Sequence, residues 1–127
     1  MKKIIFLFVA LLTATLTLAA KDKAEIKFET VSHDFGAIRA NGGQVTATYK
    51  FTNTGQKPLV IISVTNGGCG CTVPTYPKEP IQPGKSGQIT IKFNPAGRAG
   101  EFERVVKVKT NASKQREKLS FSGTIIP

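Results

Sequence analysis

Apolar and polar residues alternate along most of the chain after Lys21. The clearest alternation runs through residues 44–52, whose apolar members are Val45, Ala47, Tyr49 and Phe51. A period of two places these side chains on one face of a strand and the intervening threonines and lysine on the other. No later segment keeps the three- and four-residue apolar spacing of a helix of useful length. The pattern therefore predicts an all-β protein.

The same alternation predicts strands at residues 24–30, 87–93, 102–110 and 119–125. The side chains expected to share an inward face within these segments are Ile26, Phe28, Ile89, Ile91, Phe93, Val106, Val108, Leu119, Phe121 and Ile125. Short runs rich in glycine and asparagine separate the segments, as turns require. About seven short strands with frequent turns are typical of an immunoglobulin-like antiparallel β-sandwich.

Three segments break this alternation. Residues 59–64 are almost continuously apolar, which favours a central strand covered on both faces. Residues 72–85 contain four prolines, which cannot donate to a strand ladder, so we expect an extended connection or at most an edge strand. Residues 32–38 are predicted to form a turn, because Asp34 and Gly36 offer turn chemistry.

The first twenty residues have the organisation of a secretory signal peptide. Lys2 and Lys3 precede an apolar run at residues 4–18, and small residues at positions 17–20 provide a cleavage site. The run is shorter than the roughly 20 residues of a membrane-spanning helix. We therefore expect residues 1–20 to be removed and no transmembrane segment to remain. Residues 21–127 are then a single exported domain in the periplasm or outside the cell.

The mature chain is strongly basic. Removal of the signal peptide leaves 16 of the 18 basic side chains against eight acidic ones, so the formal net charge falls from +10 to +8. Such a balance favours anionic partners, including cell-wall polymers, lipopolysaccharide, nucleic acid and acidic proteins. Many of the cations, however, occupy alternate positions: Lys107, Lys109, Lys114, Arg116 and Lys118. This spacing favours the solvated face of a strand over a binding patch, and no nucleic-acid motif is present.

Five short motifs occur in an order that resembles a known bacterial family. They are His33-Asp34-Phe35-Gly36, Phe51-Thr52-Asn53-Thr54-Gly55 with Pro58-Leu59, Cys69-Gly70-Cys71-Thr72, Pro83-Gly84 with Ser86-Gly87, and the closing Leu119 and Gly123. They cover nearly all of residues 28–125 and resemble the exported domain-of-unknown-function family 1573. The resemblance implies an immunoglobulin-like sandwich related to Hydin-type and sperm-protein-type domains. It implies no activity, because the family has none established.

Cys69 and Cys71 are the only cysteines, and one glycine separates them. On an extended strand their Cα atoms would lie about 6.6 Å apart, near the upper limit for a disulfide, and a turn at Gly70 would shorten the span. An oxidising compartment permits the bond. A disulfide that closes so short a loop stabilises the fold by only about 1.6 kcal/mol through chain entropy. The simplest interpretation is a local structural clamp or a pair of small buried thiols.

Two functional interpretations of Cys69 and Cys71 stay open. A short-loop disulfide is commonly reducible, which favours thiol–disulfide exchange, although the sequence shows no neighbouring base that would lower a thiol pKa. Paired thiolates also suit Cu(I), so copper is the candidate cofactor. Zinc needs four ligands, and within one chain only His33 could join the cysteines without carboxylates. His33 is more typical of a turn residue, next to Asp34 as the turn cap.

The sequence offers no catalytic constellation. The chain has a single histidine, and no cue brings a nucleophile to it. We therefore expect a non-enzymatic module that binds a protein or cell-envelope component through loops or an exposed sheet edge. The segment at residues 72–85 would either shield that edge or present it. The alternative is a Cu(I)-binding or thiol-redox protein that uses Cys69 and Cys71.

Overall fold

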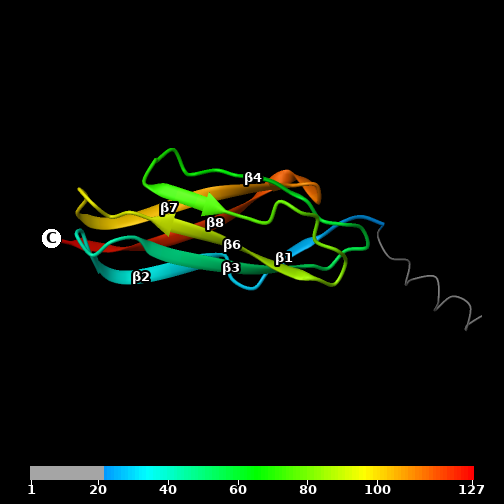
Figure 1. Cartoon of the computed structure of the whole chain (residues 1–127), viewed down its shortest axis with the longest axis horizontal. Coiled ribbons are helices and arrows are strands. Elements are labelled where there is room, and N and C mark those ends of the chain that lie inside the picture. The colour runs from blue at the N-terminus through cyan, green and yellow to red at the C-terminus, as the bar shows by residue number, and fades with distance from the viewer. Residues whose placement is uncertain (1–21) are drawn as a thin grey trace, which may run out of the picture.

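The chain folds as two β-sheets packed face to face. This computed structural model describes residues 22–127, so the predicted signal peptide at residues 1–20 lies outside the described part of the chain. Eight strands form two four-stranded layers (Figure 1). The all-β sandwich predicted from the alternation is confirmed, with eight strands in place of about seven. Within residues 22–127 there is no helix with the length and hydropathy needed to cross a bilayer.

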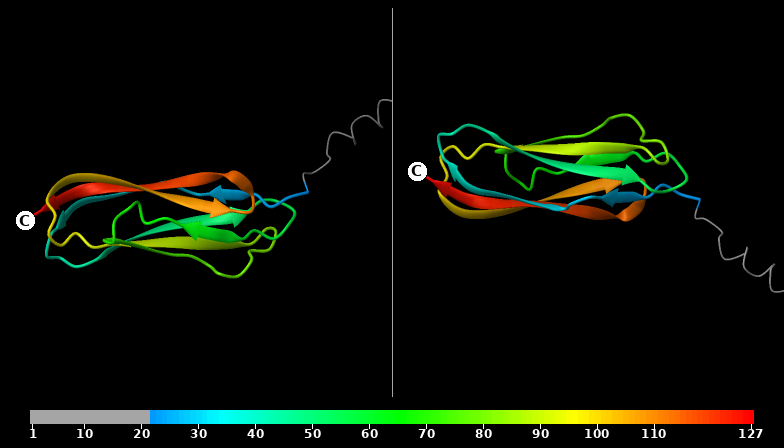
Figure 2. Two further views of the ribbon diagram at one scale, coloured as in Figure 1. Left: turned by 90° about the horizontal axis from the view of Figure 1, so that it is seen from above. Right: turned by 90° about the horizontal axis from the view of Figure 1, so that it is seen from below.

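Each sheet has its own strand order. The first sheet runs, from edge to edge, β1 (Ile26–Phe28), β3 (Val45–Asn53), β6 (Ser86–Phe93) and β5 (Thr72–Thr75). The second runs β2 (Ser32–Arg39), β8 (Ser113–Ile126), β7 (Gly100–Thr110) and β4 (Ile61–Val64). All neighbouring strands are antiparallel except β2 and β8, which are parallel. Figure 2 shows the two layers edge-on, with β7 and β8 in one and β3 and β6 in the other.

The core lies between the two sheets and is built from the predicted inward positions. Its fully buried members include Ala47, Tyr49, Phe51, Ile89, Ile91, Phe93, Val106, Val108, Leu119 and Phe121. Aromatic rings from both layers meet there, since Phe93 of β6 stacks on Phe102 of β7 with centroids 4.8 Å apart. The Tyr49 hydroxyl donates a hydrogen bond of 2.6 Å to the Ser120 carbonyl and so links β3 to β8. Burial raises the pKa of Tyr49 to about 12.

The prediction of a central strand at residues 59–64 is wrong. The strand β4 is an edge strand, and Ile62 is 48% exposed. Leu59 and Ile61 are buried, but Leu59 lies outside the strand and forms an isolated bridge with Ile81. The apolar run therefore serves two purposes, because its first half anchors a crossing segment and its second half borders the sheet. A continuous apolar pattern does not distinguish this arrangement from a strand with neighbours on both sides.

The prediction of a turn at residues 32–38 is also wrong, because this segment is the strand β2. Its turn chemistry is nevertheless present as a local irregularity. The Asp34 carboxylate accepts a hydrogen bond of 2.8 Å from the Gly36 amide, Gly36 has φ of +69°, and the register with β8 shifts between Asp34 and Ala37. Such a bulge bends a strand without ending it. The Asp-Phe-Gly motif therefore shapes an edge strand.

Asn53 of the Asn-Thr-Gly motif has a structural role. Its side chain is fully buried, and the amide donates to the carbonyls of Lys57 and Ile81 at 2.8 and 2.9 Å. Its oxygen accepts from the Gly55 amide at 2.9 Å and the Glu25 amide at 3.3 Å. A buried amide with all of these partners fixes the local chain path. This motif therefore holds the end of β3 to the segments around it.

The strand β5 is an edge strand that contains Pro74, as predicted for residues 72–85. It pairs only with β6, and its first residue, Thr72, lies opposite Phe93, the last residue of β6. Residues immediately before β5 must therefore lie beside residues immediately after β6. This register brings the cysteines next to the turn that leads into β7.

Candidate functional site

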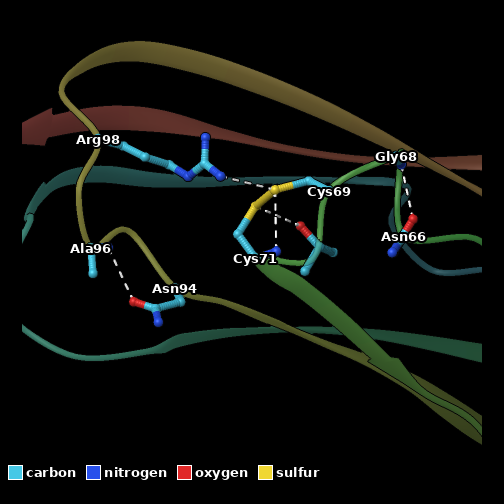
Figure 3. The surroundings of a disulfide bond; sticks show 8 residues. Asn66, Gly68, Cys69, Cys71, Asn94, Ala96 and Arg98 are labelled. Carbon is cyan, nitrogen blue, oxygen red and sulfur yellow. Dashed lines mark hydrogen bonds between the residues drawn. A yellow bond between two sulfur atoms is a disulfide. The ribbon is translucent and has the colours of Figure 1, made fainter.

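Residues 65–71 cross from β4 in one sheet to β5 in the other, and the two cysteines end this crossing (Figure 3). The Asn66 side chain accepts a hydrogen bond of 2.9 Å from the Gly68 amide. Gly67 and Gly68 have φ of +70° and +83°, a conformation that other residues rarely adopt. The two glycines thus allow the tight turn that delivers Cys69.

A disulfide joins Cys69 and Cys71. Their Cα atoms lie 5.2 Å apart, because the chain turns at Gly70 and the Thr72 amide donates to the Cys69 carbonyl at 3.2 Å. Both cysteines are half-buried. The Asn94 amide donates to the Cys71 carbonyl at 2.9 Å and fastens the loop to the turn after β6. The disulfide therefore constrains only its own short loop, and both of its cysteines are partly exposed to solvent.

The two sulfur atoms have different surroundings. The Arg98 guanidinium donates to the Cys69 sulfur at 3.1 Å, and the Cys71 amide donates to the same sulfur at 3.2 Å (Figure 3). The Cys71 sulfur has the Thr72 hydroxyl at 3.6 Å and packs against the hydrophobic core. Positive charge and N–H donors thus converge on one sulfur only.

Arg98 has no local sequence signal that links it to the cysteines. It follows Cys69 by 29 residues and lies in the exposed turn between β6 and β7. Only the register of β5 against β6 places this turn beside the cysteine loop. No residue near the cysteines in the sequence indicates this contact, because the assisting group is a cation supplied by another turn.

The structure does not gather His33 and the cysteines into a metal site. His33 lies on β2, opposite Phe121, with its ring 4.6 Å from that of Phe35. Across residues 22–127, no three or more histidine, cysteine, aspartate or glutamate side chains form a group that could hold a metal ion. The histidine therefore packs against an aromatic side chain in the second sheet.

A second candidate site is the outer surface of the β7–β8 hairpin. We call its five exposed cations the basic face: Lys107, Lys109, Lys114, Arg116 and Lys118. Lys107 and Lys118 are direct cross-strand partners, and Lys109 lies opposite Ser63. The predicted exposed face of these strands is confirmed. The register also brings like charges from two neighbouring strands together, which the spacing within one strand does not predict.

Comparisons with known proteins show which structures have a similar fold. No curated protein matches the chain. A protein of unknown function from Porphyromonas gingivalis W83 superposes with a TM-score of 0.69 at 18% identity, over 86% of this chain and 50% of that one. The VesB protease of Vibrio cholerae gives 0.60 at 10% identity, over 80% of this chain and 32% of that one. This chain thus spans half of the first protein and about a third of the second.

A further structural similarity covers nearly the whole of the other protein. WR4, a Caenorhabditis elegans MSP family member, superposes with a TM-score of 0.50 at 10% identity, over 80% of this chain and 97% of that one. Similarities at such low identity show the fold alone. The model of a family described as protein of unknown function, DUF1573, matches residues 26–125. The chain therefore belongs to the DUF1573 family, as the order of its motifs predicted.

Proposed function

We propose that this protein is an exported, non-enzymatic module that binds an anionic polymer of the cell envelope through its basic face. The observation that carries the proposal is the direct opposition of Lys107 and Lys118 on neighbouring strands. Like charges at directly opposed positions destabilise an antiparallel pair. A row of carboxylates or phosphates along the hairpin would relieve this repulsion and gain several charge interactions together.

The repulsion has no acidic neighbour in the register to offset it. Lys107, Lys109 and Lys118 have lysine or serine as their cross-strand partners. Glu117, the nearest acid in the sequence, pairs with the inward-facing Val108 and is half-buried. The one ion pair within 4 Å in the described part of the chain joins Lys57 and Asp22. The positive charge of the basic face is therefore available to an external partner.

The sheet edges offer less than this face. The edge strands β1, β4 and β5 have three, four and four residues, and β5 contains Pro74. The longer edge strand β2 carries the bulge at Gly36. Short, bulged or proline-containing edges discourage the addition of another strand. An exposed face is thus a better candidate for binding than the edge proposed from the proline-rich segment.

The export and the absence of catalysis are part of the same proposal. Residues 1–20 have the order of a signal peptide, and an envelope polymer is a partner that an exported protein meets. The single histidine packs against Phe35 and lies opposite Phe121 in the register of β2 and β8. The sandwich also corresponds to only part of the larger VesB chain, as expected of a module.

A retention experiment tests the proposal. The mature protein is passed over an immobilised anionic polysaccharide, polygalacturonate, and over neutral dextran at low and at physiological salt. We expect retention on the anionic matrix alone, weakened by salt, because exposed charges are screened beyond about 8 Å at physiological ionic strength. Competition by solubilised envelope polymer should release the protein. Equal retention on dextran would overturn the proposal.

The alternative functions of Cys69 and Cys71 can be ranked by their surroundings. The guanidinium of Arg98 lies 3.1 Å from the Cys69 sulfur. A fixed cation opposes the binding of Cu(I) at this sulfur but stabilises a thiolate there. Thiol–disulfide exchange is therefore the second candidate function, ahead of copper binding. A Cu(I) chelator competition with the reduced protein tests this order, and tight copper binding that Cys71→Ser abolishes would reverse it.

A further inference from the structure

We infer that the Cys69–Cys71 disulfide is a directional thiol–disulfide exchange site, in which a thiolate of a partner protein attacks Sγ of Cys71 and Cys69 leaves. The inference is independent of the basic face, since it depends only on the cysteine loop and the turn after β6. Its substrate class is a protein dithiol. The direction follows from the unequal surroundings of the two sulfur atoms.

Cys69 is the better leaving group. When the disulfide breaks, the departing sulfur carries a negative charge. At Cys69 this charge would meet the Arg98 guanidinium at 3.1 Å and the Cys71 amide at 3.2 Å. A positive charge and hydrogen-bond donors stabilise a thiolate, and a more stable thiolate leaves faster.

Cys71 is the poorer leaving group. Its sulfur packs against the hydrophobic core and has a single polar neighbour, the Thr72 hydroxyl at 3.6 Å. A thiolate at this position would be partly desolvated, which disfavours its charged form. Bond cleavage that leaves the charge on Cys69 is therefore favoured over cleavage in the opposite sense.

The loop leaves space for the incoming group. Cys71 is half-buried and so keeps part of its surface in solvent. Apart from its two chain neighbours, Gly70 has no atom within 4 Å of the position a side chain would occupy, and the same is true of Gly68. The glycine positions of the loop thus leave space for a thiol-bearing segment.

The exchange balances in two steps. In the first, the partner's thiolate forms a bond to Sγ of Cys71, the Cys69–Cys71 bond breaks, and its electron pair leaves with Cys69. In the second, the partner's other thiolate attacks the partner sulfur that is bonded to Cys71. This attack breaks the mixed disulfide and releases Cys71, which takes a proton from solvent. The partner dithiol is oxidised to a disulfide and the Cys69–Cys71 pair is reduced by two electrons.

Mapping of the mixed disulfide tests the direction. The full mature protein is treated with glutathione, free thiols are rapidly alkylated, and each cysteine is assigned by peptide mass spectrometry. We expect glutathione on Cys71 and the alkyl group on Cys69 in most trapped molecules. Glutathione mainly on Cys69, or equal amounts on both residues, would overturn the inference.

Substitution of Arg98 tests the cause. Arg98→Gln removes the charge from an exposed turn residue and should slow reduction by glutathione about three- to tenfold, because the leaving thiolate loses its counter-charge. Arg98→Lys should restore most of the rate, and Lys27→Gln, at an exposed position on β1, is the control for a change of net charge. A rate for Arg98→Gln equal to that of Lys27→Gln would contradict the assigned role.

Discussion

The outer faces of the two sheets are built from the same alternation of residues but differ in charge. On the first sheet, Lys50 lies opposite Gln88, and Lys92 lies opposite Thr46 and Val73. On the second, Lys107 lies opposite Lys118. The first face disperses its lysines among neutral partners, whereas the second gathers cations from adjacent strands. The difference arises from strand register.

This difference separates a solvated face from a candidate binding face. A lysine opposite threonine or glutamine keeps a strand soluble without repulsion across the ladder. The hollow on the first face is lined by Glu29, Lys50, Ser86, Gly87 and Gln88, so an acidic residue and a lysine share it. On the basic face Lys107 and Lys118 oppose each other directly, and this pairing of like charges opposes folding. A feature that opposes folding is better explained by a partner than by solubility.

The largest expected effect is on polyanion affinity. Lys107→Glu combined with Lys118→Glu should weaken binding to polygalacturonate about 30-fold or more, on the basis of roughly 1 kcal/mol per cation at an anionic surface. The matched control is Lys50→Glu combined with Lys92→Glu, which makes the same change of net charge on the other face. Isothermal titration at low salt measures both. Equal losses would show that net charge alone controls binding.

A smaller effect is expected from the bond that joins the two layers. Tyr49→Phe removes the hydrogen bond from β3 to Ser120 on β8 and should lower the free energy of unfolding by about 1 kcal/mol. It should leave polyanion affinity unchanged, because both outer faces are intact. Denaturant titration measures the stability, with Tyr76→Phe as a control at a half-buried position beneath Lys78.

The same tyrosine gives a prediction for pH. Its folded pKa of about 12 lies above the ordinary value of 10, so the folded state retains a proton that the unfolded state loses. The contribution of Tyr49 to stability is complete below pH 10 and is lost as the pH rises through about 12. Between pH 9 and pH 12, the free energy of unfolding should fall less steeply with pH for Tyr49→Phe than for the unchanged protein, as denaturant titration at each pH measures. Identical slopes for both proteins would contradict the assignment.

The smallest effect sharpens the comparison of the faces. Lys118→Glu turns a like-charge pair into an opposite-charge pair and should raise the free energy of unfolding by about 0.2–1 kcal/mol at low salt. Lys92→Glu, opposite neutral residues, should change it less. Thermal unfolding at low and high salt compares them, since salt should reduce the gain. No gain for Lys118→Glu would remove the stability argument for the basic face.

Much of the fold could be predicted because burial follows a period of two. The fully buried apolar residues of β3, β6, β7 and β8 follow from the alternation, whereas Phe102 of β7, which packs against the core, was not predicted to face inward. The predictions that were wrong concern sequence patterns that are compatible with two different structures. The apolar run at residues 59–64 became an edge strand with an anchor, and the turn residues Asp34 and Gly36 formed a bulge within β2.

The candidate sites were less predictable because both depend on pairing between distant strands. The sequence pattern contained Cys69 and Cys71, but Arg98 reaches Cys69 only through the register of β5 against β6. The lysines of the basic face were visible as alternate residues, yet the opposition of Lys107 and Lys118 exists only once β7 and β8 pair. Register is a property of the folded pair of strands, and spacing within one strand does not determine it.

The outer surface of β7 and β8 is the proposed binding site for an anionic polymer. The most direct measurement is a titration of the ¹⁵N-labelled mature protein with polygalacturonate oligomers, followed by amide chemical shifts. We predict saturable shifts concentrated at Lys107, Lys109 and residues 114–118, with β3 and β6 unperturbed. Shifts of similar size at Lys50 and Lys92, or shifts spread over all exposed lysines, would contradict the claim.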